Sequence, residues 1–135
     1  MWRMLQQDTA EDYVLATGKT TTVRDFVRMS FKEIGVELEF KGKGKAEVGI
    51  VTASNNPDYA LEVGREVVAV DPRYFRPTEV ELLLGDPTKA REQLGWQTHY
   101  TLESMTAEMV QADIELFRKD RLLRDAGFAV RNEFE

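Results

Sequence analysis

Residues 22–41 constrain the fold more than any other part of this chain, because a helical repeat there runs directly into a strand repeat. Asp25 follows Thr22 at nearly the spacing of a capping box, which marks the start of a helix, and Gly35 is placed to end it. The inner face of this helix is predicted from a three- and four-residue repeat at Val23, Phe26, Val27, Ser30, Phe31 and Ile34. From residue 36 to residue 41 apolar and charged side chains alternate, which predicts a half-buried strand. We therefore expect an α/β fold with a few short strands and three to four helices.

Two short apolar runs predict further strands. Residues 13–16 form one such run before a turn, and residues 67–70 form another before Asp71 and Pro72 break the chain. Between them, residues 46–66 lose their periodicity and contain the turn-forming stretch 54–58, so we expect a loop or a small flap there.

Three more helices are predicted outside this region, and a fourth at the start of the chain. Residues 1–5 carry an apolar stripe at helical spacing, and Asp86 with Pro87 marks a helix start for which Gly95 is the stop. Thr101 caps a longer helix, and Gly127 closes a last helix that contains residues 122 and 123. The longer helix repeats apolar side chains at Leu102, Met105, Met109, Ala112 and Leu116.

Composition excludes several classes of function. The net charge of −6 and the pI of about 4.9 oppose binding to nucleic acid or to an anionic membrane, since both require clustered cations. The chain has no cysteine, so it forms no disulfide and no zinc site with sulfur ligands, which suits a cytoplasmic location. We find no export leader and no run approaching the roughly 20 apolar residues of a membrane span, so we expect no membrane association. The 135 residues are enough for one domain, 1–135.

The usual catalytic and cofactor motifs are incomplete. Gly18, Lys19 and Thr20 imitate the end of a phosphate-binding loop, but Tyr13 stands where its first glycine is needed. No tyrosine has a lysine four positions later, as a short-chain dehydrogenase needs, and no strand ends in a glycine-rich dinucleotide turn. His99 is the only histidine, and we expect it at the surface or at an edge. We therefore expect no catalytic residue, no metal site and no cofactor bound by this chain.

Arg76 and Glu79 are the strongest candidates for a binding site. They are three residues apart after a predicted strand, with Pro77 between them fixing part of the backbone. An arginine can hold a diphosphate with its fork of N–H donors, and a carboxylate can accept hydrogen bonds from ribose hydroxyls. The alternative is an ordinary ion pair on a helix surface. Spacing alone leaves both interpretations open.

Several sequence blocks resemble the extended short-chain dehydrogenases that act on nucleotide sugars, specifically the GDP-mannose 4,6-dehydratases. The matching blocks are MWRMLQQ, EDYVLATG, TVRDFV, VAVDPRYFRPTEVELLLGDPTKAREQLGW and the helix that begins TLESM. The resemblance implies a small C-terminal substrate-binding lobe, with the dinucleotide-binding half and its catalytic residues outside this chain. The sequence departs from the family pattern at Gln97 and Thr98, where a lysine and a proline are usual.

The resemblance also implies a function and site residues. The full-length enzyme would use NADP to convert GDP-mannose to GDP-4-keto-6-deoxymannose, with Arg76 on the diphosphate and Glu79 on the ribose. Arg24, in TVRDFV, would lie near the nucleotide or simply face solvent. This chain alone is expected to be inactive.

Two other functions remain open from the sequence. A related nucleotide-sugar reductase or epimerase would share the nucleotide grip, and a non-catalytic interaction module would use the apolar face of the first helix. A lobe without its cofactor domain exposes apolar surface, so we also expect a homo-oligomer.

Overall fold

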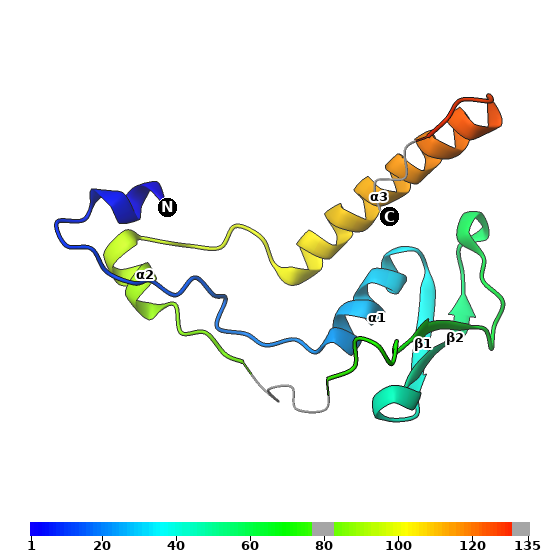
Figure 1. Ribbon diagram of the computed structural model, residues 1–135, viewed down its shortest axis with the longest axis horizontal. Helices are drawn as coiled ribbons and strands as arrows, with labels where there is room; N and C mark the ends of the chain where they lie inside the picture. The colour runs from blue at the N-terminus through cyan, green and yellow to red at the C-terminus, as the bar shows by residue number, and fades with distance from the viewer. Residues whose placement is uncertain (77–82, 131–135) are drawn as a thin grey trace.

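The computed structural model describes residues 1–76 and 83–130. The chain is elongated, with two groups of elements at opposite ends (Figure 1). One end holds the short 3-10 helix η1 (Trp2–Gln6) and α2 (Thr88–Leu94). The other end holds α1 (Val23–Glu33), a three-stranded sheet and the long helix α3 (Leu102–Asp125). The expected α/β class and the small size of the lobe are confirmed.

The sheet is antiparallel and its strands follow chain order. β1 (Val36–Lys41) pairs with β2 (Val48–Ser54), and β2 pairs with β3 (Glu66–Ala69). Helix α1 packs against β1 and against α3, and the two fully buried valines of the sheet, Val36 and Val51, form the centre of the core. The predicted strands at 36–41 and 67–70 are confirmed, although β3 is half-buried rather than buried.

The prediction of a loop across residues 46–66 is wrong, because this stretch contains β2, the central strand. Residues 48–51 of β2 are all buried or half-buried, so both faces of the strand are partly covered and no apolar–polar alternation marks it, and a glycine at position 49 hides the pattern further. A Cβ on Gly49 would lie 3.0 Å from the Cβ of Val68, so a side chain at this position would crowd β3. The predicted turn-forming stretch 54–58 is confirmed, since it leads into the 3-10 helix η3 (Pro57–Tyr59).

The predicted helix starts and stops are confirmed. Thr22 accepts the backbone N–H of Asp25 at 3.1 Å at the start of α1, and Gly35 follows the helix with a φ of 72°. Asp86 accepts the backbone N–H of Thr88 at 2.9 Å at the start of α2, which ends at Gly95 with a φ of 58°. These positive φ values are costly for side chains other than glycine.

Helix α3 differs from its prediction in two ways. It runs unbroken to Asp125, so the predicted last helix is the continuation of α3. Its buried side chain is Thr106, whose hydroxyl donates to the carbonyl of Leu102 at 2.7 Å, whereas Met105 and Met109 of the predicted stripe are exposed. The stripe predicted the helix correctly but not the face that α3 turns to the core.

The predicted strand at residues 13–16 is wrong. Within the described part of the chain these residues are extended but pair with no strand, and Val14 and Leu15 are about half exposed, at 53% and 51%. Side-chain hydrogen bonds tie this stretch to the region of α2 instead, including one of 2.9 Å from the hydroxyl of Tyr13 to Gln93. An apolar run alone cannot say whether a neighbouring strand is available.

The predicted first helix is the 3-10 helix η1, and its Arg3 connects it to the end of α2. Arg3 Nη1 donates to the carbonyls of Leu94 and Gly95 at 2.9 Å each, so Arg3 satisfies carbonyl groups at the C-terminal end of α2. None of the helices in residues 1–76 and 83–130 is both long and apolar enough to cross a bilayer.

Candidate functional site

One end of the sheet gathers the segments that carry the predicted binding residues. Lys41, Val48 and Ala69 are register partners across the three strands. The end of β1, the start of β2 and the end of β3 therefore meet in one row. The turn after β1 contains the 3-10 helix η2 (Gly44–Ala46), and the segment after β3 leads to Arg76.

Arg24 reaches this end of the sheet from the first turn of α1. Its Nε donates to Glu47 Oε1 at 2.7 Å, and its Nη2 donates to the same oxygen. Glu47 lies directly between η2 and β2, so the sheet fixes its backbone. Arg24 is thus partly exposed but oriented, rather than a freely solvated helix residue.

The ring of Phe40 supports two arginines on the same helix. The guanidinium carbons of Arg24 and Arg28 lie 5.6 Å and 5.2 Å from the ring centroid, which is the range of a cation–π contact. Arg28 also bonds Asp25 at 3.2 Å. The pKa of Asp25 is lowered, first by the hydrogen bond from the Thr22 hydroxyl and also by Arg28.

The segment that leads to Arg76 is a tight turn stabilised by its own charges. Asp71 accepts hydrogen bonds from the backbone and the guanidinium of Arg73, at 2.9 Å and 2.7 Å. These bonds lower the pKa of Asp71, and the same pairing raises the pKa of Arg73. Phe75, two residues after Arg73, lies against η2, and Lys45 Nζ lies 5.5 Å from the centroid of its ring.

Arg76 follows Phe75 and is exposed, and it forms no ion pair or hydrogen bond with the described residues. Glu79 lies outside the described residues. Through Phe75 and η2, the structure therefore brings the segment of Arg76 to the same sheet end as Arg24, while the partnership of Arg76 with Glu79 stays a prediction.

The local charge at this sheet end opposes the charge of the whole chain. Lys43 and Lys45 are exposed in the turn after β1, and Lys41 is exposed at the end of β1, where it pairs with Glu39, although the chain as a whole carries −6. A cluster of lysines and arginines suits an anionic ligand such as a diphosphate. Among the described residues, no group of histidine and acidic side chains is arranged to hold a metal ion.

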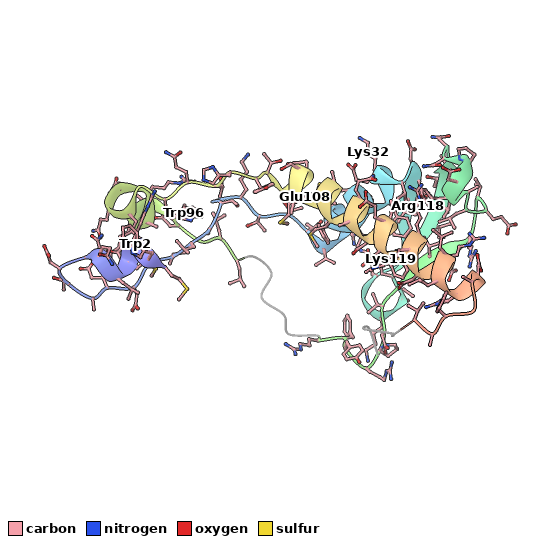
Figure 2. The ribbon with its side chains drawn as sticks, turned by 90° about the horizontal axis from the view of Figure 1, so that it is seen from above. Trp2, Lys32, Trp96, Glu108, Arg118 and Lys119 are labelled. Carbon is pink, nitrogen blue, oxygen red and sulfur yellow. The ribbon has the colours of Figure 1, made fainter. Side chains whose placement is uncertain are left out.

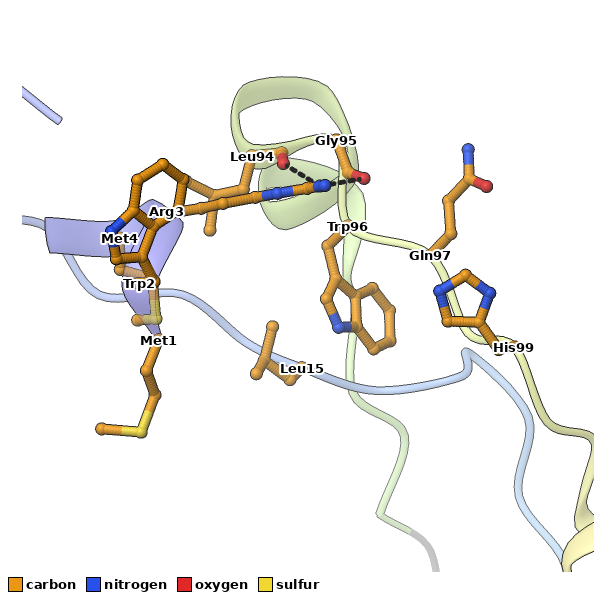
Figure 3. Close-up of a pocket in the computed structure, with 10 residues that line it drawn as sticks. All are labelled: Met1, Trp2, Arg3, Met4, Leu15, Leu94, Gly95, Trp96, Gln97 and His99. Atoms are coloured by element: carbon orange, nitrogen blue, oxygen red, sulfur yellow. Dashed lines mark hydrogen bonds between the residues drawn. The ribbon is translucent and has the colours of Figure 1, made fainter. Parts of the chain in front are cut away.

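Two cavities lie away from this sheet end. One, of about 600 Å³, is mainly apolar and lies between η1 and the end of α2, where Trp2, Leu15 and Trp96 surround the Arg3 contacts (Figure 3). Its rim includes His99, which is exposed as expected. The other, of about 720 Å³, lies between the segment before α1 and the start of α3. Neither cavity is lined by Arg24 or Arg76.

Comparison with known proteins decides the family. The sequence model described as "GDP-mannose 4,6 dehydratase" matches residues 1–109, which include the whole candidate site. This chain belongs to the GDP-mannose 4,6-dehydratase family. The resemblance seen in the sequence blocks is therefore confirmed.

Individual relatives in this family are similar over nearly all of the chain. The GDP-mannose 4,6-dehydratase of Yersinia enterocolitica is 55% identical over 131 residues, which are 96% of this chain and 35% of the relative. A Vibrio cholerae relative of the same name is 52% identical over 96% of this chain and 35% of its own length. The GDP-mannose 4,6 dehydratase 2 of Caenorhabditis elegans is 48% identical over 89% of this chain and 29% of its own length. The chain thus spans about a third of the length of these relatives.

Sequence reasoning missed the contacts of Glu47 and Phe40 with Arg24 in the candidate site. Glu47 fell in the stretch predicted to be a loop, and it lies 23 positions from Arg24, so no local spacing connects the two. Phe40 was predicted only as a buried strand residue. Its contact with α1 depends on how the helix crosses the sheet.

Proposed function

We propose that this chain is the substrate-binding part of a cytoplasmic GDP-mannose 4,6-dehydratase, a lyase that converts GDP-mannose to GDP-4-keto-6-deoxymannose. The single observation that supports this most is the family match over residues 1–109, because that range contains Arg24, Arg76 and Glu79. The electropositive sheet end adds support, since a diphosphate requires cations and N–H donors.

In this proposal the chain binds and orients the nucleotide. Arg76 and Arg24 donate to oxygens of the diphosphate, and the carboxylate of Glu79 accepts hydrogen bonds from the ribose hydroxyls. Holding the diphosphate and ribose fixes the mannose relative to the reacting groups, which is a positional contribution to catalysis. No catalytic group is assigned to this chain.

The residues of this chain do not fit the cofactor NADP. The three α-helices in the described residues have Thr22, Pro87 and Thr101 as their N-cap residues, and none of them follows the glycine-rich turn that seats a dinucleotide pyrophosphate. We therefore assign NADP to other parts of a full-length enzyme and derive no step through it.

A chimeric enzyme tests this function. The matching 131 residues of the Yersinia enterocolitica relative would be replaced by this chain, and product formation from GDP-mannose would be followed by NMR. We expect the chimera to make the keto sugar and the isolated chain to make none. A correctly folded chimera without turnover would contradict the proposal.

The diphosphate grip is tested in the same chimera with Arg76→Ala. Loss of a charged hydrogen bond to the diphosphate should raise the KM for GDP-mannose by about 10- to 100-fold. Arg73→Ala is the matched control, because Arg73 is an exposed arginine in the same segment that is already paired with Asp71. An unchanged KM in Arg76→Ala would contradict the assigned role.

A further inference from the structure

We propose that Glu47 is a positioning residue that aims Arg24 at the diphosphate of the nucleotide. This inference rests on the proposed function, because it assumes that the sheet end binds a nucleoside diphosphate. It adds a residue that neither the sequence motifs nor the resemblance assigned to the site.

The donors that Glu47 uses decide which edge of Arg24 stays open. A guanidinium is planar and has five N–H donors. Nε and Nη2 both donate to Glu47 Oε1, so the side edge of the plane is occupied. Three N–H groups remain, and two of them, one on Nη1 and one on Nη2, form the outer edge, which can bind two oxygens of a phosphate group at once.

The burial of the two side chains agrees with this division of roles. The side chain of Glu47 is 21% exposed, whereas that of Arg24 is 47% exposed. The carboxylate is therefore the sheltered anchor and the guanidinium is the accessible group. Since Glu47 directly precedes β2 and the register pairs Val48 with Lys41, the anchor belongs to the rigid sheet.

Phe40 restricts the guanidinium further. Its ring lies 5.6 Å from the guanidinium carbon of Arg24, and Phe40 belongs to β1, which pairs with β2 beside Glu47. Arg24 is thus held by an aromatic ring of β1 and by a carboxylate that directly precedes β2. Fixing a long side chain before the ligand arrives lowers the conformational entropy lost on binding.

The carboxylate of Glu47 has two opposite effects on diphosphate binding. A carboxylate beside a diphosphate repels it, so Glu47 weakens binding through its charge and strengthens it through its hydrogen bonds. A glutamine keeps an oxygen that can accept both N–H groups but removes the charge. Glu47→Gln should therefore preserve the aim, whereas Glu47→Ala should lose it.

Glu47 variants of the GDP-mannose 4,6-dehydratase chimera test this role. We expect Glu47→Ala to raise the KM for GDP-mannose and the Kd for GDP by about tenfold with little change in kcat, and Glu47→Gln to stay within about twofold. Glu39→Ala is the matched control, because Glu39 is an exposed glutamate of β1 that forms a pair of 3.4 Å with Lys41 of the same strand. This control should leave KM and Kd unchanged.

Exchanging the charges of Arg24 and Glu47 distinguishes a positioning role from an ion pair that only stabilises the fold. The double variant Arg24→Glu with Glu47→Arg restores an ion pair, so its Tm should recover from that of Arg24→Glu. Its KM should not recover, because the group now aimed at the diphosphate is a carboxylate. Recovery of both Tm and KM would overturn the inference and leave a structural ion pair.

Two further outcomes would also overturn the inference. An unchanged Kd for GDP in Glu47→Ala would mean that Arg24 is not positioned by Glu47. A lower Kd would mean that Glu47 competes with the nucleotide for Arg24. Both results leave the proposed function standing, since the parent chimera still turns over GDP-mannose. A parent chimera that neither binds GDP nor turns over GDP-mannose contradicts the proposed function, and the inference falls with it.

Discussion

At the scale of single residues, each α-helix in the described structure starts with a side chain that accepts a backbone N–H from a residue two or three positions later. Thr22 does this for α1, Asp86 for α2 and Thr101 for α3. The cap is reciprocal at α3, where the hydroxyl oxygen of Ser104 in turn accepts the backbone N–H of Thr101. Such pairs satisfy N–H groups that have no partner inside the helix.

Thr101→Ala should loosen the first turn of α3. Removing an N-cap hydroxyl costs about 1 kcal/mol, so the Ser104 amide, which donates to Thr101 at 3.1 Å, should exchange its hydrogen faster. Hydrogen exchange by NMR measures this directly. Thr98→Ala is the control, an exposed threonine just before the helix, and equal exchange in the two variants would contradict the capping role.

Asp86 should make the start of α2 sensitive to acid. The pKa of Asp86 is lowered, first by the hydrogen bond from the Thr88 hydroxyl at 2.6 Å and then by the Thr88 backbone N–H. A lowered pKa means that the folded state prefers the ionised carboxylate. This stabilisation is present above the ordinary pKa of about 3.9 and is lost as the pH falls through the lowered value.

A carboxyl titration of Asp86 by NMR checks this expectation. The midpoint should lie below the ordinary value in the unmodified chain and should move up in Thr88→Val, which removes the hydroxyl donor but keeps the shape of the side chain. Identical midpoints in the two proteins would contradict the assigned cause.

At the scale of elements, β2 is the strand that contributes both to the core and to the sheet end that carries the candidate site. It pairs with both other strands, contributes the buried Val51, and is directly preceded by Glu47. Gly49 lets β2 approach both neighbours closely, since a Cβ there would lie 3.0 Å from Val68 and 3.2 Å from the ring of Phe40. The packing of β2 and the support of Arg24 are therefore linked through Phe40.

Gly49→Ala should destabilise the sheet by overpacking, by about 1 to 3 kcal/mol. Urea unfolding should show a lower midpoint. Adding Val68→Ala makes room for the new methyl group, so the double variant should lose less stability than the two single variants together. Strict additivity would show that the clash with Val68 is not the cause.

At the scale of the whole molecule, the chain exposes far more surface than a compact protein of its mass. Its accessible surface is 11365 Å², compared with about 7,200 Å² expected for a folded monomer of this size. Figure 2 shows the reason, since Trp2 and Trp96 lie at one end and Lys32 and Arg118 at the other, joined by thin connections. Large apolar side chains such as Trp2, 72% exposed, face solvent.

Such exposure predicts that the 135-residue chain self-associates through the end that carries η1. Replacing Trp2 and Leu5 with aspartate should shift the sedimentation velocity profile toward the monomer, because both side chains are highly exposed there. The control is Val63→Asp, which changes an exposed valine near the sheet. Association unaffected by the Trp2 and Leu5 changes would place the contact elsewhere.

The local features of this protein are predictable from its amino-acid sequence. Helix starts, the glycine stops at Gly35 and Gly95, and the alternating strand β1 were predictable because each depends on residues within a few positions of one another. The family was predictable for a different reason, since the blocks that carry it are contiguous. The charge and the absence of cysteine likewise needed only composition.

Features that join residues far apart in the chain depend on the three-dimensional packing. Whether residues 13–16 and 48–54 become strands depends on available neighbours, so the first prediction failed and β2 was missed. The buried face of α3 depends on how it crosses α1, because its sequence offers apolar side chains on more than one side. The pairing of Arg24 with Glu47 joins residues 23 positions apart, and it exists because α1 crosses the end of the sheet where β2 begins.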